Sequence, residues 1–226
     1  MEEIRLIEVK EEILADNKNV ATGVREHLRK SKTMLLNLMS SPGSGKTSLI
    51  LKTAEGLKES LRMGVIEADI DSIVDAEKVA AQGIPAIQLR TGGFCHLDAS
   101  MVNKGIEAMA VNELDLIIIE NVGNLVCPAG FQLGEDMKVV LLSTTEGDDK
   151  PGKYPSAFFN AQVMLVTKID LLPHTNFNLD AAKRDALKIN PSLTVFEVSS
   201  LKDEGMGDWL DWLMQALEAK RKKREL

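Results

Sequence analysis

The run SSPGSGKTS at residues 40–48 constrains this chain more than any other feature. It follows an apolar stretch at residues 34–39 and leads into residues 49–54, which have the composition of a helix. A strand, a glycine-rich turn and a helix in this order are what a phosphate-binding loop requires. The backbone N–H groups of such a turn, with the helix N-terminus behind them, form a cavity complementary to phosphate oxygens. The sequence therefore predicts a binding site for a nucleoside phosphate.

The side chains of this loop have distinct expected roles. Lys46 can place its ammonium group on the terminal phosphates, and the Thr47 hydroxyl can coordinate the Mg²⁺ ion that bridges them. Ser40 occupies the first position of the usual GxxxxGK[ST] pattern, where glycine is expected. The alternative, an ordinary glycine turn with a surface lysine, does not account for the strand and helix on either side. The residues expected to contact the nucleotide here are Gly43, Ser44, Gly45, Lys46, Thr47 and Ser48.

The composition excludes several function classes. The 226 residues carry a formal net charge of −7, so no global positive field attracts nucleic acid or an anionic membrane. No apolar run approaches the roughly 20 residues that a membrane-spanning helix needs. The charged stretch at residues 1–13 lacks the pattern of a signal peptide, and two cysteines do not suggest a disulfide scaffold. We expect a cytoplasmic protein, in which thiols stay reduced, with no nucleic acid and no membrane as partners.

Apolar runs and helical spacing alternate along the chain. Strands are predicted at residues 34–39, 65–68, 86–89, 114–119, 139–142, 163–166 and 194–198. Helices are predicted at residues 8–31, 48–61, 74–82, 98–112, 178–188 and 207–219. This alternation predicts a three-layer α/β fold of the P-loop NTPase type, a mainly parallel sheet of about seven strands flanked by helices. We expect a single domain over residues 1–226, with a helical extension at residues 1–32 and a basic tail at residues 220–226.

A second motif selects the base. Thr167, Lys168 and Asp170 follow a predicted strand and resemble the NKxD element of GTPases, with Thr167 in place of asparagine. The Asp170 carboxylate can accept two hydrogen bonds from the ring N–H and amine of guanine, which adenine does not offer. In GTPases the asparagine amide normally connects this base-selecting segment to the phosphate loop. Because Thr167 lacks that amide, we expect weaker nucleotide affinity but a retained preference for GTP. A further base-contacting loop is expected at Ser199, Ser200 and Leu201.

A third element combines carboxylates with a glycine. The apolar strand that ends in Glu120 has the Walker B arrangement, in which the carboxylate holds Mg²⁺ or its water and the Gly123 N–H senses the γ-phosphate. Asp69 and Asp75 follow another strand and can reach the metal ion or orient the attacking water. Asp75 can also be a first-turn acid of its helix. We expect Mg²⁺ to be held by Thr47, Asp69, Asp75 and Glu120, and catalysis to involve Lys46, Asp75 and Glu120.

The two cysteines lie in segments that follow the predicted strands. Cys95 and His96 come after the glycine pair of TGG, which favours a loop in which a thiolate and an imidazole converge on one ion. Cys127 lies four residues beyond Gly123. Two thiolates and an imidazole suit Zn²⁺ or Ni²⁺, and pairing two chains would supply six ligands. The alternative is two buried cysteines that act as small hydrophobic residues.

At the level of whole segments, TGGFCHLDA at residues 91–99 and ENVGNLVCPA at residues 120–129 closely resemble the hydrogenase nickel-incorporation GTPase family. The likeness extends to STTEGDDK at residues 143–150 and TKIDLLP at residues 167–173. The resemblance implies a GTPase of the signal-recognition and nitrogenase-iron-protein class that forms GTP-dependent homodimers. We expect slow intrinsic hydrolysis, because no arginine is obviously placed as a finger. The resemblance further implies nickel transfer to the large subunit precursor of [NiFe]-hydrogenase, and a small zinc-containing nickel chaperone as partner. It also implies that Cys95, His96 and Cys127 form the GTP-responsive metal site.

The chain departs from some members of this family. Residues 1–30 contain neither a CxxCGC motif nor a histidine-rich stretch, so we expect only the metal site linked to the nucleotide. Urease-activating GTPases, which have Cys-Pro-His at this point, and the GTPases that chaperone cobalamin mutases, which lack this cysteine pattern, are the alternative enzymes. A metal-binding module that responds to nucleotide without hydrolysing it is the non-enzymatic alternative.

Overall fold

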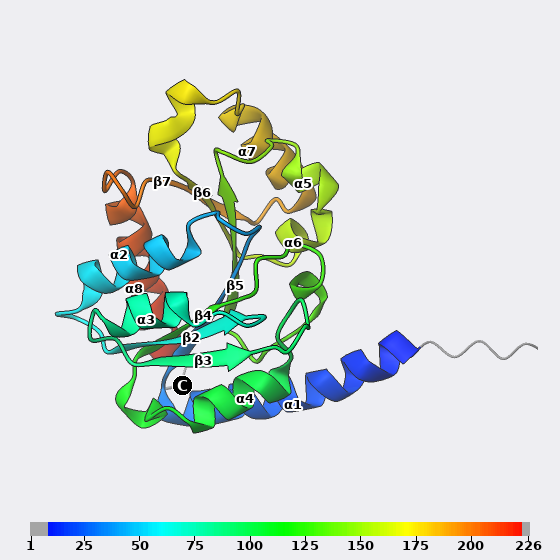
Figure 1. Ribbon diagram of the computed structural model, residues 1–226, viewed down its shortest axis with the longest axis vertical. Helices are drawn as coiled ribbons and strands as arrows, with labels where there is room; N and C mark the ends of the chain where they lie inside the picture. Colours follow the sequence, from blue (N-terminus) through cyan, green and yellow to red (C-terminus); the bar gives the residue numbers. More distant parts are fainter. Residues whose placement is uncertain (1–8, 223–226) are drawn as a thin grey trace, which may run out of the picture.

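Seven strands form one parallel sheet in the order β3-β2-β4-β1-β5-β6-β7 (Figure 1). The computed structural model describes residues 9–222, with side chains from residue 16 onward. The strands are β1 (Met34–Met39), β2 (Met63–Asp69), β3 (Ala86–Arg90), β4 (Leu116–Glu120), β5 (Met137–Ser143), β6 (Val163–Thr167) and β7 (Thr194–Val198). Every residue of β1, β4 and β6 is buried, as in strands covered on both faces.

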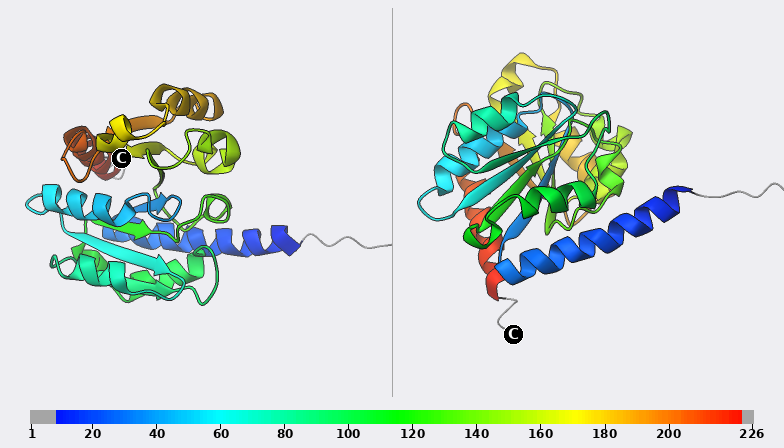
Figure 2. Two further views of the ribbon diagram at one scale, coloured as in Figure 1. Left: turned by 45° about the horizontal axis from the view of Figure 1, so that its top comes forward. Right: turned by 60° about the horizontal axis from the view of Figure 1, so that its bottom comes forward.

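Helices cover both faces of the sheet (Figures 1 and 2). Their bounds are α1 (Val9–Ser31), α2 (Lys46–Leu57), α3 (Val74–Ala80), α4 (Ala99–Glu107), α5 (Lys150–Lys153), α6 (Pro155–Phe159), α7 (Leu179–Ile189) and α8 (Met206–Lys222). Alternate residues of β1 enter opposite cores: Leu36 packs with α2 and α8, and Leu35 packs with α1 and α4. A third cluster joins β5 and β6 to α6 and α7. The predicted three-layer α/β fold is confirmed.

Three short helical turns complete the chain path. They are 3₁₀ turns at Val111–Glu113, Pro128–Gly130 and Ile169–His174. The helix predicted at residues 98–112 is too long, because α4 ends at Glu107 and a 3₁₀ turn follows it. Helices α5 and α6 were not predicted, since four and five residues are too few to produce a periodic apolar pattern. None of the described helices is long and apolar enough to cross a membrane.

The first helix anchors the N-terminal segment to the fold. Buried Ala21, Val24 and Leu28 lie on one side of α1, which runs beside α4 (Figure 2). The Asn17 amide donates a 2.7 Å hydrogen bond to the Gln132 carbonyl oxygen and accepts a 2.8 Å bond from the Ala99 N–H. Residues 1–8 of the expected extension and residues 223–226 of the expected basic tail lie outside the described part of the chain.

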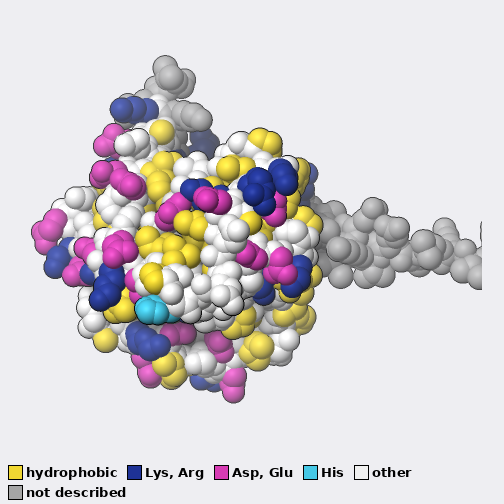
Figure 3. Space-filling model, turned by 90° about the horizontal axis from the view of Figure 1, so that it is seen from above, with side chains coloured by type: hydrophobic (Ala, Val, Ile, Leu, Met, Phe, Trp, Pro, Cys, Tyr) yellow, Lys and Arg dark blue, Asp and Glu magenta, His cyan; other side chains and the backbone are white. Residues whose placement is uncertain are grey.

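The outer surface mixes charges of both signs. On the face seen in Figure 3, acidic and basic side chains are interspersed with hydrophobic ones. This mixture agrees with a chain that has 27 basic and 34 acidic residues.

Candidate nucleotide and metal site

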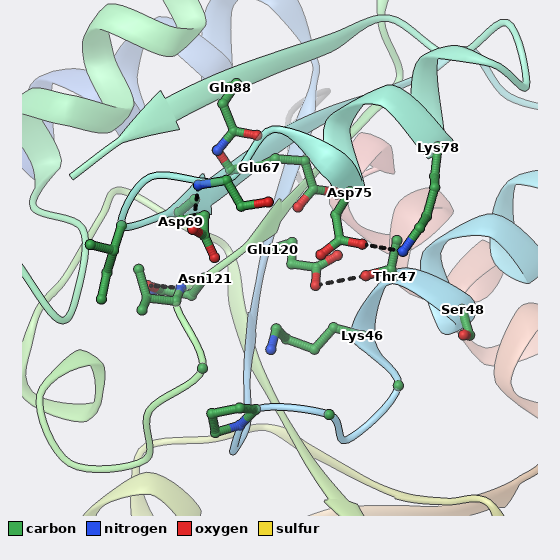
Figure 4. A pocket seen from close by; sticks show the side chains of 18 of the residues that line it. Lys46, Thr47, Ser48, Glu67, Asp69, Asp75, Lys78, Gln88, Glu120 and Asn121 are labelled. Atoms are coloured by element: carbon green, nitrogen blue, oxygen red, sulfur yellow. Dashed lines mark hydrogen bonds and ion pairs between the residues drawn. The ribbon is translucent and has the colours of Figure 1, made fainter. Parts of the chain in front are cut away.

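A cleft of about 550 Å³ lies at the carboxyl ends of β1, β2 and β4. The phosphate loop, the ends of β2 and β4, and the start of α3 line it (Figure 4). This is the edge at which ligands of open parallel sheets bind, because strand order diverges there and helix N-termini point at the opening. The sequence-predicted residues Ser48 and Gly123 both line this cleft.

The phosphate loop has the backbone that its glycines permit. Gly43 and Gly45 have φ values of 75° and 94°, and Gly45 immediately precedes the start of α2 at Lys46. Only glycine adopts such angles routinely. The Lys46 side chain is 7% exposed, and its ammonium group donates a 3.1 Å hydrogen bond to the Ser40 hydroxyl. The residue that departs from the usual pattern thus orients the lysine.

Two carboxyl groups face each other beside the loop. Glu67 of β2 and Glu120 of β4 are register partners, 3% and 6% exposed. The Thr47 hydroxyl donates a 3.0 Å hydrogen bond to Glu120 Oε1. Burial, followed by the nearby charge of Glu120, raises the pKa of Glu67 to about 9, and burial also raises the pKa of Glu120. Sequence reasoning missed Glu67, for which the signal was a carboxylate inside an otherwise apolar strand.

Two further acids lie at the same edge (Figure 4). Asp69 ends β2, and its carboxylate accepts hydrogen bonds from the N–H groups of Asp71 and Ser72 at 3.0 and 2.7 Å. Asp75, in the first turn of α3, pairs with Lys78 at 2.8 Å. Carboxylate and hydroxyl oxygens are the ligands that Mg²⁺ prefers. The hydroxyl of Thr47 and a buried, unpaired oxygen of Glu120 fit such an ion.

The base loop is tied to the phosphate loop by two hydrogen bonds. The Thr167 hydroxyl donates a 2.7 Å bond to the Ser44 carbonyl oxygen, and the Lys168 ammonium group donates a 2.7 Å bond to the Gly43 carbonyl oxygen. The expectation that replacing asparagine by Thr167 removes this tie is therefore wrong. The shorter threonine side chain reaches the loop because β6 ends directly beside it.

The expected guanine-contacting residues lie near one another. The Ser199 hydroxyl donates a 2.5 Å hydrogen bond to the Asp170 carboxylate and accepts a 3.1 Å bond from the Lys202 N–H. Ser200 is half-buried, whereas Leu201 is 80% exposed. The two segments thus contact each other, and of their expected site residues only Lys168 lines the 550 Å³ cleft.

Glu146 is a second residue that sequence reasoning missed. Its carboxylate accepts hydrogen bonds from the Ser44 hydroxyl at 2.6 Å and from the Ser143 N–H at 3.3 Å. It lies in the STTEGDDK segment, whose only signal in the sequence is its resemblance to the corresponding segment of the hydrogenase nickel-incorporation GTPases. The segment after β5 thus contacts the phosphate loop directly through Glu146.

The cysteines and His96 converge within one chain. One ligand atom from each of Cys95, His96 and Cys127 lies within 4.8 Å of the other two, and all three residues are half-buried. Cys95 Sγ is 3.7 Å from His96 Nδ1, and both cysteines are free thiols. A hydrogen bond with Cys127 raises the pKa of Cys95, and burial lowers the pKa of His96. Once the two thiols are deprotonated, two thiolates and a neutral imidazole suit Ni²⁺ or Zn²⁺.

Neighbouring residues hold the two metal-site loops together. The Asn124 amide donates a 3.3 Å hydrogen bond to the Cys95 carbonyl oxygen, and the Phe131 ring lies 4.1 Å from the His96 ring. Lys138 donates to the carbonyl oxygens of Ala129 and Phe131 at 3.0 and 2.6 Å. The loop after β4 is thereby fixed at both ends, with Cys127 between them.

Comparisons with known proteins agree with this geometry. The CobW/HypB/UreG nucleotide-binding domain model matches residues 11–197. Hydrogenase maturation factor HypB of Azotobacter chroococcum is 45% identical over 220 residues, covering 97% of this chain and 72% of that protein. The crystal structure of HypB from Archaeoglobus fulgidus has 39% identity and a TM-score of 0.85, covering 90% of this chain and 100% of that one.

A second similar structure was solved with a bound metal. HypB from Helicobacter pylori, in complex with nickel, has 38% identity and a TM-score of 0.86, covering 92% of this chain and 97% of that one. The chain therefore belongs to the CobW/HypB/UreG family of nucleotide-binding domains, and its relatives within that family include hydrogenase maturation factors HypB.

Proposed function

We propose that this chain is a metal-binding GTPase that couples GTP binding and hydrolysis to the delivery of nickel into the large subunit of [NiFe]-hydrogenase. The observation that carries the proposal is that one segment serves both sites. Gly123 packs so tightly on Pro42 of the phosphate loop that an added Cβ would lie 2.9 Å from it. Four residues later, Cys127 lies within ligand reach of Cys95 and His96.

The nucleotide cleft would perform phosphoryl transfer to water. Lys46 offsets charge on the phosphates, Thr47 and Glu120 hold Mg²⁺, and Asp69 and Asp75 hold the ion's water or orient the attacking water. Gly43, Ser44, Gly45 and Ser48 cradle the phosphates with their N–H groups. Turnover is slow, below ~1 per second, because no arginine is placed as a finger among the described residues of the cleft.

Guanine would be selected at the rim of the cleft. The Asp170 carboxylate accepts hydrogen bonds from guanine, and the aliphatic stem of Lys168 covers one face of the base. Ser199, Ser200 and Leu201 contact it from the loop after β7. The hydrogen bond from Ser199 to Asp170 supports this arrangement, because it orients the carboxylate.

The metal cargo would be held by Cys95, His96 and Cys127. Three ligands leave one tetrahedral position open, which suits transfer better than storage. A second copy bound in the GTP state would bring its own three ligands to the same edge. Phe94 and Val126, which flank the cysteines in sequence and are 60% and 62% exposed, are apolar surface that such a homodimer would bury.

A nickel cargo requires a protein that supplies it and a protein that receives it. We infer that these partners are a small zinc-containing nickel chaperone and the hydrogenase large subunit precursor. We place the reaction in the cytoplasm, where thiolates remain reduced, and treat residues 1–226 as one GTPase domain. Zn²⁺ would compete for the same donors.

A metal titration in two nucleotide states tests the proposal. Ni²⁺ and Zn²⁺ affinities are measured anaerobically with GDP and with a non-hydrolysable GTP analogue. We expect a change of about 5- to 150-fold between the two states, equal to the effect of metal on nucleotide affinity. Cys95→Ala, Cys127→Ala and His96→Ala should each weaken binding, whereas His27→Ala, at an exposed position, should not.

Two outcomes would contradict the proposal. Equal metal affinity in both nucleotide states would show that nucleotide and metal binding are not coupled. Unchanged metal binding in all three ligand variants would show that the cysteines have only a structural role. Absence of any GTP turnover would favour a metal-binding module that only responds to nucleotide.

A further inference from the structure

Glu67 has no assigned role, yet its carboxyl group points into the nucleotide cleft (Figure 4). It is 3% exposed, and its Oε1 atom has no hydrogen-bond partner among the described residues. Glu120 Oε2, on the neighbouring strand, is also buried and unpaired. An unsatisfied buried carboxylate oxygen costs folding free energy. Two such atoms side by side in a cleft therefore point to a ligand that satisfies them.

The charges of the cleft indicate what kind of ligand this is. Glu67, Glu120 and Asp75 point toward one another (Figure 4), so three acidic groups gather at this point of the cleft. Of the nearby lysines, Lys46 is held by Ser40, and Lys78 is paired with Asp75. Among the described residues, no lysine or arginine forms an ion pair with Glu67 or Glu120. Carboxylate oxygens and a neighbouring threonine hydroxyl form a set of hard donors, which suits Mg²⁺ rather than a softer metal.

The strand register decides how Glu67 can reach such an ion. Glu67 and Glu120 are opposite one another on β2 and β4, and Glu120 is the residue that contacts Thr47. Because β4 lies between β2 and β1 in the sheet, Glu67 is one strand further from the phosphate loop than Glu120. Mg²⁺ usually keeps several of its waters in proteins. A carboxylate at this position is suited to bind a metal-held water.

We propose that Glu67 is an outer ligand of the Mg²⁺ site, which accepts a hydrogen bond from a metal-bound water. This inference rests on the proposed function, because it requires Mg²⁺ at Thr47 and Glu120. A divalent cation at that point favours the ionised form of the neighbouring carboxyl groups. Outer partners of this kind orient the inner ligands and contribute substantially to metal affinity.

A purely structural role for Glu67 makes a different prediction. In that case a neutral Glu67 donates a hydrogen bond to Glu120, and the nearly isosteric glutamine would replace it with little change. Glu67→Gln keeps the shape and a donor but removes the acceptor charge. The metal affinity of Glu67→Gln therefore distinguishes the two roles, whereas its stability does not.

The test measures Mn²⁺ binding to the GDP complex of the full chain by electron paramagnetic resonance. We expect Glu67→Gln to weaken Mn²⁺ binding by about 10–100-fold, while GDP affinity in EDTA and the unfolding temperature without metal do not fall. Glu67→Asp, which keeps the charge on a shorter side chain, should lose less affinity than Glu67→Gln. Glu59→Gln, the same change at an exposed position beyond α2, should leave Mn²⁺ binding unchanged.

The outcomes distinguish this inference from the proposed function. A loss of less than about threefold in Glu67→Gln would overturn the inference. If that variant does not fold, an Mn²⁺ affinity of Glu67→Asp equal to that of the wild type would overturn it as well. Failure of the wild type to bind GDP or Mn²⁺ would instead refute the nucleotide site itself.

Discussion

The Thr167 hydroxyl donates a 2.7 Å hydrogen bond to the Ser44 carbonyl oxygen, which joins the end of β6 to the phosphate loop. Both residues are almost fully buried. The bond holds the segment that we propose to select the base at a constant separation from the phosphate loop, as a nucleotide that spans both would require. Breaking it should affect stability and affinity together.

Thr167→Val should lower the free energy of unfolding by about 1–3 kcal/mol, because it leaves a buried carbonyl oxygen without its partner. GDP affinity should fall as well, since the two loops are no longer tied. Urea unfolding and calorimetric titration with GDP measure the two effects. Thr22→Val, on an exposed part of α1, is the control. Unchanged stability and affinity would show that the tie has no role.

Lys46→Ala should abolish detectable GTP hydrolysis and leave the fold intact. The substitution removes the cation that offsets phosphate charge, and the Ser40 hydroxyl keeps its bond to the Ser41 carbonyl oxygen. Steady-state phosphate release and circular dichroism measure activity and folding. Lys58→Ala, at an exposed position just after α2, should keep wild-type turnover. If Lys46→Ala hydrolysed GTP at the wild-type rate, this cleft could not be the site of hydrolysis.

Asp170→Asn should shift the base preference from guanine toward xanthine. An amide presents a donor where the carboxylate only accepts, and the Ser199 hydroxyl can still hydrogen-bond to its oxygen. Competition of GTP, XTP and ATP against a labelled nucleotide measures the preference. Asp180→Asn, in the exposed first turn of α7, is the matched control. A variant that still prefers GTP would place Asp170 outside the base pocket.

Lys138→Met should destabilise the protein by about 3–5 kcal/mol, because it leaves a buried Glu135 carboxylate unpaired. Lys138 and Glu135 are 3.6 Å apart, with side chains only 9% and 5% exposed. Lys183→Met removes the half-buried surface pair with Glu197, which is far more accessible to water, and should cost about 1 kcal/mol or less. Urea unfolding of both variants measures the difference. Equal losses would contradict the buried role of Lys138.

The same lysine gives the stability a pH dependence. Burial lowers the pKa of Lys138 below its ordinary value of 10.5. Between the lowered pKa and 10.5, the unfolded chain binds more protons than the folded chain, so the free energy of unfolding rises with pH. The stability difference between wild type and Lys138→Met should therefore increase as pH rises through this window. A difference that is constant with pH would show that Lys138 keeps its ordinary pKa.

Asn124→Ala should reduce the coupling between nucleotide and metal. Its amide connects the segment after Gly123 to the Cys95 carbonyl oxygen at 3.3 Å. Nickel affinity with GDP should change little, because all three ligands remain, but its ratio between the GTP-analogue and GDP states should move toward one. Asn112→Ala, in an exposed turn, is the control. A ratio equal to that of the wild type would exclude this connection.

The local features of this protein could be predicted because contiguous residues encode them. SSPGSGKTS contains the two glycines that adopt positive φ and the lysine and threonine that face the cleft. Continuous apolar runs marked the buried strands, so the layered fold followed from their alternation with helices. Cys95, His96 and Cys127 follow the ends of predicted strands, which predicted that they share one edge of the sheet. Their ligand atoms do lie together. Their metal and nucleotide roles stay predictions.

The pairings between distant residues were decided by the tertiary structure alone. Glu67 faces Glu120 only because β2 and β4 are neighbours in register, and strand order and register depend on packing across the whole sheet. Thr167 replaces an asparagine tie because β6 brings its hydroxyl within reach of Ser44. Lys138 pairs with Glu135 and supports the loop after Cys127 through carbonyl oxygens that no sequence motif marks. A sequence specifies which groups are present, whereas burial and register determine which of them meet.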